Sequence, residues 1–283
     1  MKRLAAVLVA LALAGCAEPS SVGQEPTPTP TPTPAYAADD AVLRVEYRGG
    51  LLPRETVPDG PYWALYGDGR VVTRGPEPDI HPGQAMPNLR VAAVPAPTVT
   101  ELVEAAREAG IDGVRRDYGD PPVADASTTV FVLRTEDGVV ETAVYALAEH
   151  GDEGNEARRK LYDFHRRLTA EREDGGFGGR SSDEVYEPAA VAVFARPYTE
   201  HDDDGLAVDH REQELRWRGP DPATGEDTRA GRCTVVTGAA LATVLPDLRR
   251  ANTLTRWRYD GKDWALGLRP LFPDESTCAD VLA

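Results

Sequence analysis

The sequence has few of the residues from which enzyme and metal sites are usually built. It contains five histidines and three cysteines among 283 residues, and no two histidines have the helical spacing of a zinc site such as H-E-x-x-H. A phosphate-binding P-loop, a dinucleotide fingerprint and the glycine frame of a nucleophilic serine are also missing. No motif in the sequence therefore indicates an enzyme.

Positive charge is scarce as well. The chain has 31 lysines and arginines against 47 aspartates and glutamates, which gives a formal net charge of -16 at pH 7. This balance opposes binding to nucleic acid or to anionic lipid headgroups through charge alone. We therefore expect no nucleic-acid partner.

The apolar run at the start of the chain is too short to cross a bilayer, which takes about 20 residues. This run, Leu4 to Leu13, follows two basic residues and precedes small ones, a pattern that predicts a signal peptide over residues 1–15. The tetrad LAGC at 13–16 resembles the lipobox of bacterial lipoproteins, which implies that Cys16 is lipidated and begins the mature chain. An ordinary secretory signal with a chance cysteine is the alternative.

Proline and threonine alternate after this tetrad, in the stretch EPTPTPTPTP at residues 25–34. Alternating proline favours the polyproline II conformation, which rises about 3.1 Å per residue and forms no packed fold. We interpret residues 16–40 as a lipidated spacer. The folded part is then expected at the extracytoplasmic face of the cell membrane, attached through the lipid.

With Cys16 assigned to lipid, the remaining thiols are Cys233 and Cys278. In an exported protein such a pair favours a disulfide, which would close a loop of about 45 residues and stabilise the fold by roughly 3 to 4 kcal/mol. A catalytic thiol is the alternative, but neither cysteine has a histidine or asparagine beside it in the sequence.

Strands are predicted around three Asp-Gly pairs, at 68–69, 137–138 and 260–261. Each pair is typical of a β-hairpin because both residues tolerate the positive φ of a tight turn. Alternation of apolar residues is clearest before the second pair, where one face of the strand carries Thr129, Phe131 and Leu133.

Three segments have helical periodicity: about 98–110, 155–170 and 239–251. In the first, Thr98 and Glu101 have the spacing of a capping box and a glycine ends the segment. The third contains Pro246, which is expected to kink or divide the helix.

The second helical segment contains the basic run RRKLYDFHRR at 158–167. We expect Ala157 and three larger apolar residues to face inward and Arg158 to face outward or sideways with the other basic residues. Such a face could recruit a polyanion such as a wall polymer. The solvated face of an amphipathic helix is the alternative.

The order of these elements predicts an α+β fold of antiparallel β-sheets with helices packed on one face. A polar, glycine-rich segment divides the pattern into two similar ββαββ-type halves. We expect a first α+β domain at 41–170, a linker or long loop at 171–187, and a second α+β domain or half at 188–283. One domain or two remain open.

The densest acidic cluster, EHDDDG at 200–205, is a candidate calcium site. If Glu200 opened an EF-hand-like loop, Asp202 and Asp204 would fall at its third and fifth positions, where oxygen ligands belong. The twelfth position is Arg211 rather than a bidentate carboxylate. A solvated acidic loop is the alternative, and no other cofactor is indicated.

Four segments resemble an uncharacterised family of actinobacterial lipoproteins, over essentially the whole mature chain: ALYGDGRVV, HPGQAMPNLRV, DYGDPPVADASTTVFVL and RPLFPDESTC. The family has no known activity, so this resemblance supports lipidation and nothing catalytic. Residues 42–170 also resemble emfourin-type inhibitors of thermolysin-like metalloproteases, through YRGG at 47–50, DYG at 117–119 and the hairpin at 128–147. This second resemblance implies a fold but no inhibitory residues, since an insertion at 76–95 departs from it.

The leading interpretation is a non-enzymatic, membrane-anchored cell-envelope lipoprotein with a binding or structural role. Its partner would be an envelope protein or a wall polymer. Inhibition of a secreted protease is the first alternative. The second is an extracytoplasmic hydrolase that would use His201, Asp202 and His210. The sequence indicates neither a ligand nor an oligomeric state.

Overall fold

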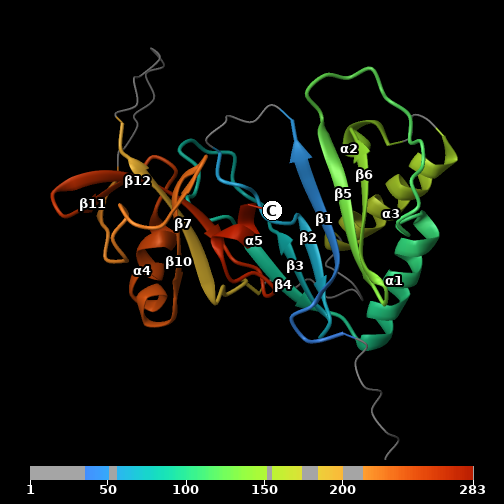
Figure 1. Cartoon of the computed structure of the whole chain (residues 1–283), viewed down its shortest axis with the longest axis horizontal. Helices are drawn as coiled ribbons and strands as arrows, with labels where there is room; N and C mark the ends of the chain where they lie inside the picture. Colours follow the sequence, from blue (N-terminus) through green and yellow to red (C-terminus); the bar gives the residue numbers. More distant parts are fainter. Residues whose placement is uncertain (1–35, 51–55, 152–154, 174–183, 200–212, 283) are drawn as a thin grey trace, which may run out of the picture. The chain divides into compact units, whose positions relative to one another are not determined.

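The structure is a computed structural model that describes residues 36–50, 56–151, 155–173, 184–199 and 213–282. The chain from Pro34 to Ala283 forms one compact unit, which contains two six-stranded sheets and five helices in its described part (Figure 1). The expected α+β fold is confirmed. The predicted division between residues 170 and 188 stays a prediction.

The first sheet has the strand order β4-β3-β2-β1-β5-β6, and all its neighbouring strands are antiparallel. Phe131 and Leu133 of β5 are buried on one face, as their alternation predicted. The strands are β1 (Ala41–Gly49), β2 (Trp63–Tyr66), β3 (Arg70–Arg74), β4 (Leu89–Ala93), β5 (Ser127–Thr135) and β6 (Gly138–Tyr145).

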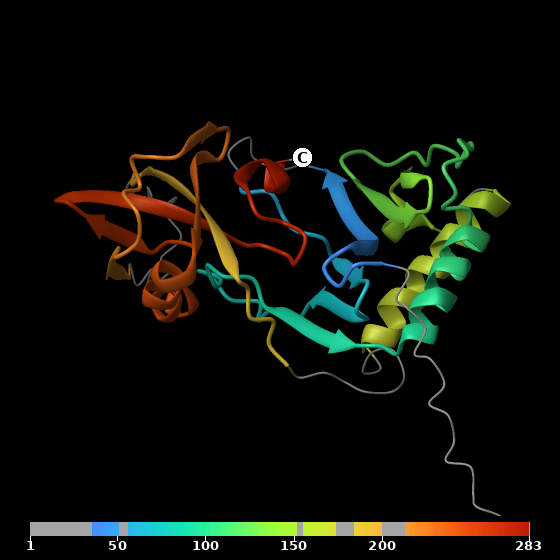
Figure 2. The same cartoon turned by 60° about the horizontal axis from the view of Figure 1, so that its bottom comes forward.

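Two helices, α1 (Ala96–Ala109) and α3 (Glu156–Glu173), cover that face of the first sheet and contact each other (Figure 2). A short helix, α2 (Leu147–His150), follows β6. Gly110 ends α1 as expected, with a φ of 103° and its N–H bonded to the carbonyls of Ala106 and Arg107. A positive φ of this kind is typical of glycine at a helix C-terminus.

The capping box predicted at Thr98 is wrong. Helix α1 begins at Ala96, its N-cap is Pro95, and no side chain caps it. The sequence VPAPT places two prolines at this end. Proline is well tolerated in the first turn because its φ is already helical and no intrahelical N–H bond is required there. The prolines therefore allow the helix to start ahead of the threonine.

The second sheet has the order β8-β11-β12-β7-β10-β9, with one parallel pair, β8 and β11. Both faces of the central strand β7 are buried. Helix α4 (Gly238–Arg250) covers one face, and α5 (Cys278–Leu282) packs on the other. The strands are β7 (Ala190–Pro197), β8 (Glu214–Arg216), β9 (Glu226–Thr228), β10 (Gly231–Thr237), β11 (Arg256–Tyr259) and β12 (Lys262–Pro270).

The two halves share element types but not connections. The central strand β1 lies between β2 and β5, whereas β7 lies between β10 and β12. The strand that follows helix α1 is β5, which lies beside the central strand of the first sheet. The strand that follows helix α4 is β11, which is separated from the central strand of the second sheet by β12. The likeness of the halves therefore does not extend to their strand order.

The turns agree with the predicted hairpins to different degrees. Asp260 and Gly261 both have positive φ, 46° and 73°, and form the two-residue turn between β11 and β12 as predicted. In the hairpin of β5 and β6, however, Gly138 pairs with Thr135, so the turn residues are Glu136 and Asp137. Helix α4 continues through Pro246 without division.

The predicted disulfide between Cys233 and Cys278 is present and joins β10 to α5. It fastens residues 271–282, which we call the C-terminal strap. The strap contacts both sheets: the N–H of Leu271 donates to the carbonyl of Ala190, whereas Phe272 packs among buried residues of the first sheet. Asp274 accepts a bond from the Tyr66 hydroxyl and pairs with Arg44. The strap therefore links the two sheets.

Candidate functional site

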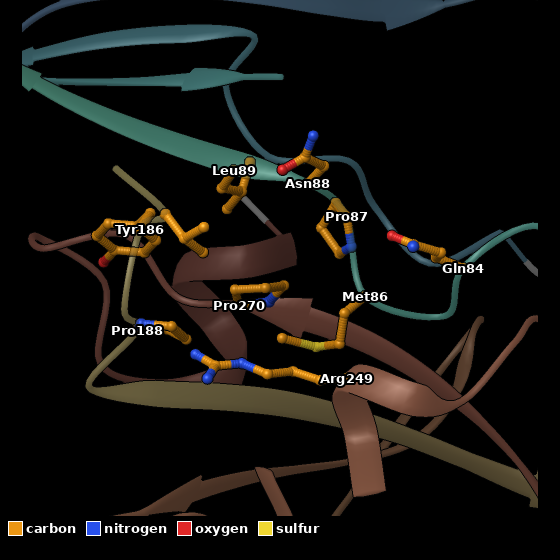
Figure 3. A pocket seen from close by; sticks show the side chains of 10 residues that line it. Gln84, Met86, Pro87, Asn88, Leu89, Tyr186, Pro188, Arg249 and Pro270 are labelled. Carbon is orange, nitrogen blue, oxygen red and sulfur yellow. The ribbon is translucent and has the colours of Figure 1, made fainter. Parts of the chain in front are cut away.

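A pocket with a volume of about 140 Å³ is the candidate functional site (Figure 3). Its walls come from the segment before β4, from residues 185–188, and from the ends of α4 and β12. Most of the lining side chains are apolar, and three are polar. The lining residues are Gln84, Met86, Pro87, Asn88, Leu89, Val185, Tyr186, Pro188, Arg249 and Pro270.

The walls of the pocket are held by main-chain hydrogen bonds. On one side, the N–H of Ala85 donates to the carbonyl of Ala251 at 3.0 Å, and the N–H of Thr253 donates to that of Gly83 at 2.9 Å. On the other, the N–H of Tyr186 donates to the carbonyl of Leu89 at 3.0 Å. These bonds hold segments that are far apart in the sequence around one pocket. Walls that are already ordered lose less conformational entropy when a ligand binds.

Arg249 supplies the positive charge of the pocket. It lies in the last turn of α4, where a cation interacts favourably with the helix dipole. Figure 3 shows its guanidinium directed toward the Pro188 side of the pocket. The guanidinium pairs with the carboxylate of Glu187, and the two side chains are 43% and 64% exposed. An ion pair this exposed is weak.

Tyr186 contributes an aromatic wall rather than an acid or base. Its hydroxyl donates to the carbonyl of Leu271 at 2.8 Å, and its ring stacks on Phe272 with centroids 6.1 Å apart. Burial raises the pKa of Tyr186 to about 12, so the hydroxyl stays protonated at neutral pH. The lining residues can therefore bind an apolar group and pair with an anion, but they include no nucleophile or general base.

The calcium candidates Glu200, Asp202 and Asp204 lie outside the described residues, and so do His201 and His210. In the part of the chain that the structure describes, no three His, Cys, Asp or Glu residues are grouped so that they could hold a metal ion. The calcium site stays a prediction.

The basic run 158–167 is not exposed throughout: Arg159, Lys160, Arg166 and Arg167 are exposed, but the first arginine is not. Arg158, predicted to face outward or sideways, is buried with 1% of its surface exposed, while Ala157 is only half-buried. Position 158 precedes Leu161 by three residues and Leu168 by ten, so it belongs to the apolar stripe of the helix. This spacing was the available signal for its burial.

The buried guanidinium of Arg158 bonds to carbonyls where β6, α2 and α3 meet. It donates to the carbonyls of Tyr145 and Ala146 at 2.8 Å each and to that of His150 at 3.0 Å. Buried carbonyls need such donors, since a polar group without a partner is costly. Arg158 therefore has a structural role instead of a polyanion-binding one.

His165 is also buried in this helix. Its Nε2 shares a hydrogen bond of 2.7 Å with the Tyr47 hydroxyl, and its ring lies edge-on to Phe131. Burial lowers the pKa of His165 to about 4, although the charge of Glu149 acts in the opposite direction. The imidazole is therefore neutral in the folded protein at neutral pH.

His165 is expected to make the protein less stable in acid. The unfolded chain protonates this histidine near pH 6.5, whereas the folded chain protonates it only near pH 4. The contribution of the neutral His165 to the free energy of unfolding is therefore fully present above pH 6.5 and is lost as the pH decreases toward 4. The loss at pH 4.5 is about 2 to 3 kcal/mol. Urea unfolding of the natural protein and of His165→Gln at pH 7 and 4.5 measures it. Equal pH dependence in both proteins would contradict the assignment.

No protein-family model, curated protein or solved structure matches the chain. The resemblances to actinobacterial lipoproteins and to emfourin-type inhibitors therefore stay predictions. Within the described residues, the helices are too short or too polar to cross a bilayer. The sequence did not reveal the pocket, because Met86, Tyr186 and Arg249 are far apart along the chain and meet only through the fold.

Proposed function

We propose that the chain is a lipid-anchored, non-enzymatic protein of the cell envelope that binds a ligand in the pocket beside Arg249. The anchor is supported by the short apolar run, the LAGC tetrad and the proline-threonine spacer. The disulfide suits an oxidising compartment outside the cytoplasm.

The binding role rests on one observation, the pocket whose walls are held by main-chain hydrogen bonds. Its lining is mostly apolar with a few polar groups, which is the usual composition of a small-ligand site. A guanidinium at the rim adds charge selectivity. These groups recognise a ligand but supply no chemistry to transform it.

Lipidation of Cys16 is the first test of this proposal. We expect mass spectrometry of the protein from its native host to find a mature N-terminal peptide that begins at Cys16 and carries a diacylglyceryl group on sulfur. The protein should partition into the detergent phase, and Cys16→Ser should lose the modification. Two acyl chains bind a membrane stably, whereas one alone binds marginally.

The matched control is the double variant Cys233→Ser/Cys278→Ser, which removes the other two cysteines and should keep the lipid. An unmodified Cys16 thiol in the natural protein would contradict the anchor. It would leave the pocket, which lies elsewhere in the chain, to be judged on its own.

A further inference from the structure

We propose that the pocket binds a small apolar carboxylate, with the ligand's carboxylate on Arg249 in place of that of Glu187. This inference rests on the binding role proposed above but not on the lipid anchor. Three features support it: the size of the pocket, the planar set of N–H donors on Arg249, and the exposure of the Glu187 carboxylate that now pairs with those donors.

The size of the pocket selects a small group. Its volume is about 140 Å³, and an apolar cavity of roughly 150 Å³ admits a benzene-sized molecule. A single aromatic ring or a branched aliphatic chain therefore fits. Met86, Pro188 and Pro270 offer apolar contact, and the unbranched methionine can adapt to the shape of the ligand.

The charge of the pocket selects an anion. A guanidinium presents several N–H donors in a planar fork that matches a carboxylate. The pair with Glu187 shows that a carboxylate reaches this guanidinium at the rim of the pocket. The ligand's carboxylate would take the position of the Glu187 group, which acts as its stand-in.

The ligand's carboxylate can displace the Glu187 carboxylate from Arg249 because the two groups have different surroundings. The Glu187 side chain is 64% exposed and returns to water at little cost, because exposed ion pairs contribute little. A ligand would make two contacts at once, with its apolar end against Pro270 and its carboxylate on Arg249. Each contact would help to hold the other in place. Glu187 therefore acts as a weak internal competitor, and its removal should strengthen binding.

The methionines of the chain provide a direct measurement. Met86 lies in the pocket, and the other methionine, Met1, lies in the predicted signal peptide. Full-length protein in detergent, labelled with ¹³C-methyl methionine, is titrated with sodium isovalerate and with isovaleramide, its neutral analogue. We expect a saturable shift of the Met86 methyl resonance with isovalerate, in the millimolar range for so small a probe. Isovaleramide should bind at least tenfold more weakly.

Variants test each part of the site. Arg249→Gln should weaken isovalerate binding at least tenfold because it removes the charged fork, whereas Glu187→Gln should strengthen it several-fold. Met86→Trp should fill the pocket and abolish binding, which is read from the ¹³C-carboxyl resonance of labelled isovalerate. The matched control is Arg250→Gln, which changes the neighbouring arginine, paired with Asp247, and should leave binding unchanged.

Equal binding of acid and amide, no effect of Arg249→Gln, weaker binding to Glu187→Gln, or no Met86 shift with isovalerate would each overturn the proposal. If Arg249→Gln does not fold by circular dichroism, the acid–amide pair and Glu187→Gln still decide. N-acetylleucine distinguishes two sources of the carboxylate. If N-acetylleucine binds more tightly than isovalerate, the natural ligand's carboxylate is the C-terminus of a peptide. If N-acetylleucine does not bind, the natural ligand is a free acid. Failure of this experiment would leave the lipid anchor untouched.

Discussion

Replacement of Glu275 by leucine is expected to lower the free energy of unfolding by about 3 to 5 kcal/mol, because it leaves the Arg269 guanidinium buried without a counter-charge. The two side chains are each 5% exposed, and their closest nitrogen and oxygen atoms are 2.7 Å apart. The second oxygen of Glu275 accepts the N–H of Phe272 at 2.7 Å, so the substitution also breaks a bond within the C-terminal strap. Urea denaturation at pH 7 measures the loss.

The double variant Arg269→Met/Glu275→Leu separates the unpaired charge from other effects. A buried ion pair replaced by apolar residues of similar volume is often neutral or better, so most of the lost stability should return. Glu156→Gln, which breaks an exposed pair with Lys160, should leave the stability almost unchanged, because exposed ion pairs contribute little. A Glu275→Leu variant no less stable than this control would contradict the prediction.

Replacement of Arg158 by leucine should have an effect of similar size, about 3 to 4 kcal/mol. The substitution removes the guanidinium bonds to the carbonyls of Tyr145, Ala146 and His150. The Ala146 carbonyl keeps the N–H of His150 as a donor, but a buried polar group that loses its partner costs about 1 to 3 kcal/mol. Arg158→Lys should not restore the loss, because an ammonium cannot reproduce the planar fork. Thermal and urea unfolding measure both variants.

Arg159→Leu is the matched control for Arg158. Residue 159 is the next position of the same helix and is exposed, so this substitution should change stability by no more than about 0.5 kcal/mol. Equal stability of the two leucine variants would show that the buried guanidinium contributes nothing. A large loss in the Arg158 variant alone would place it among the structural residues of the first sheet.

The local predictions succeeded where neighbouring residues alone decide the conformation. Gly110 ends α1 and the Asp260-Gly261 turn closes its hairpin, because only a few residues tolerate positive φ. With Cys16 predicted to carry a lipid, Cys233 and Cys278 left one pairing within the chain, and it is present. Alternation correctly assigned the buried face of β5 because neighbouring side chains of a strand point to opposite faces.

The predictions failed where two local signals competed or where burial was set from a distance. Thr98 had the spacing of a cap, but the prolines before it began the helix earlier. Arg158 was expected outside because arginine is seldom buried unless paired, and its carbonyl partners come from a strand end and a short helix. The pairing of residues 184–186 with β4, at the end of the expected linker, was not foreseen either.

Periodicity, the positions of glycine and proline, and the number of cysteines were enough to predict the α+β class, the main hairpins and helices, and the cysteine pair. The strand order, the burial of the Glu275 side chain, and the meeting of Met86, Tyr186 and Arg249 around one pocket are visible only in the folded structure. The reason is physical: a conformational preference acts between near neighbours, whereas burial and charge pairing depend on which distant segments the folded chain brings together.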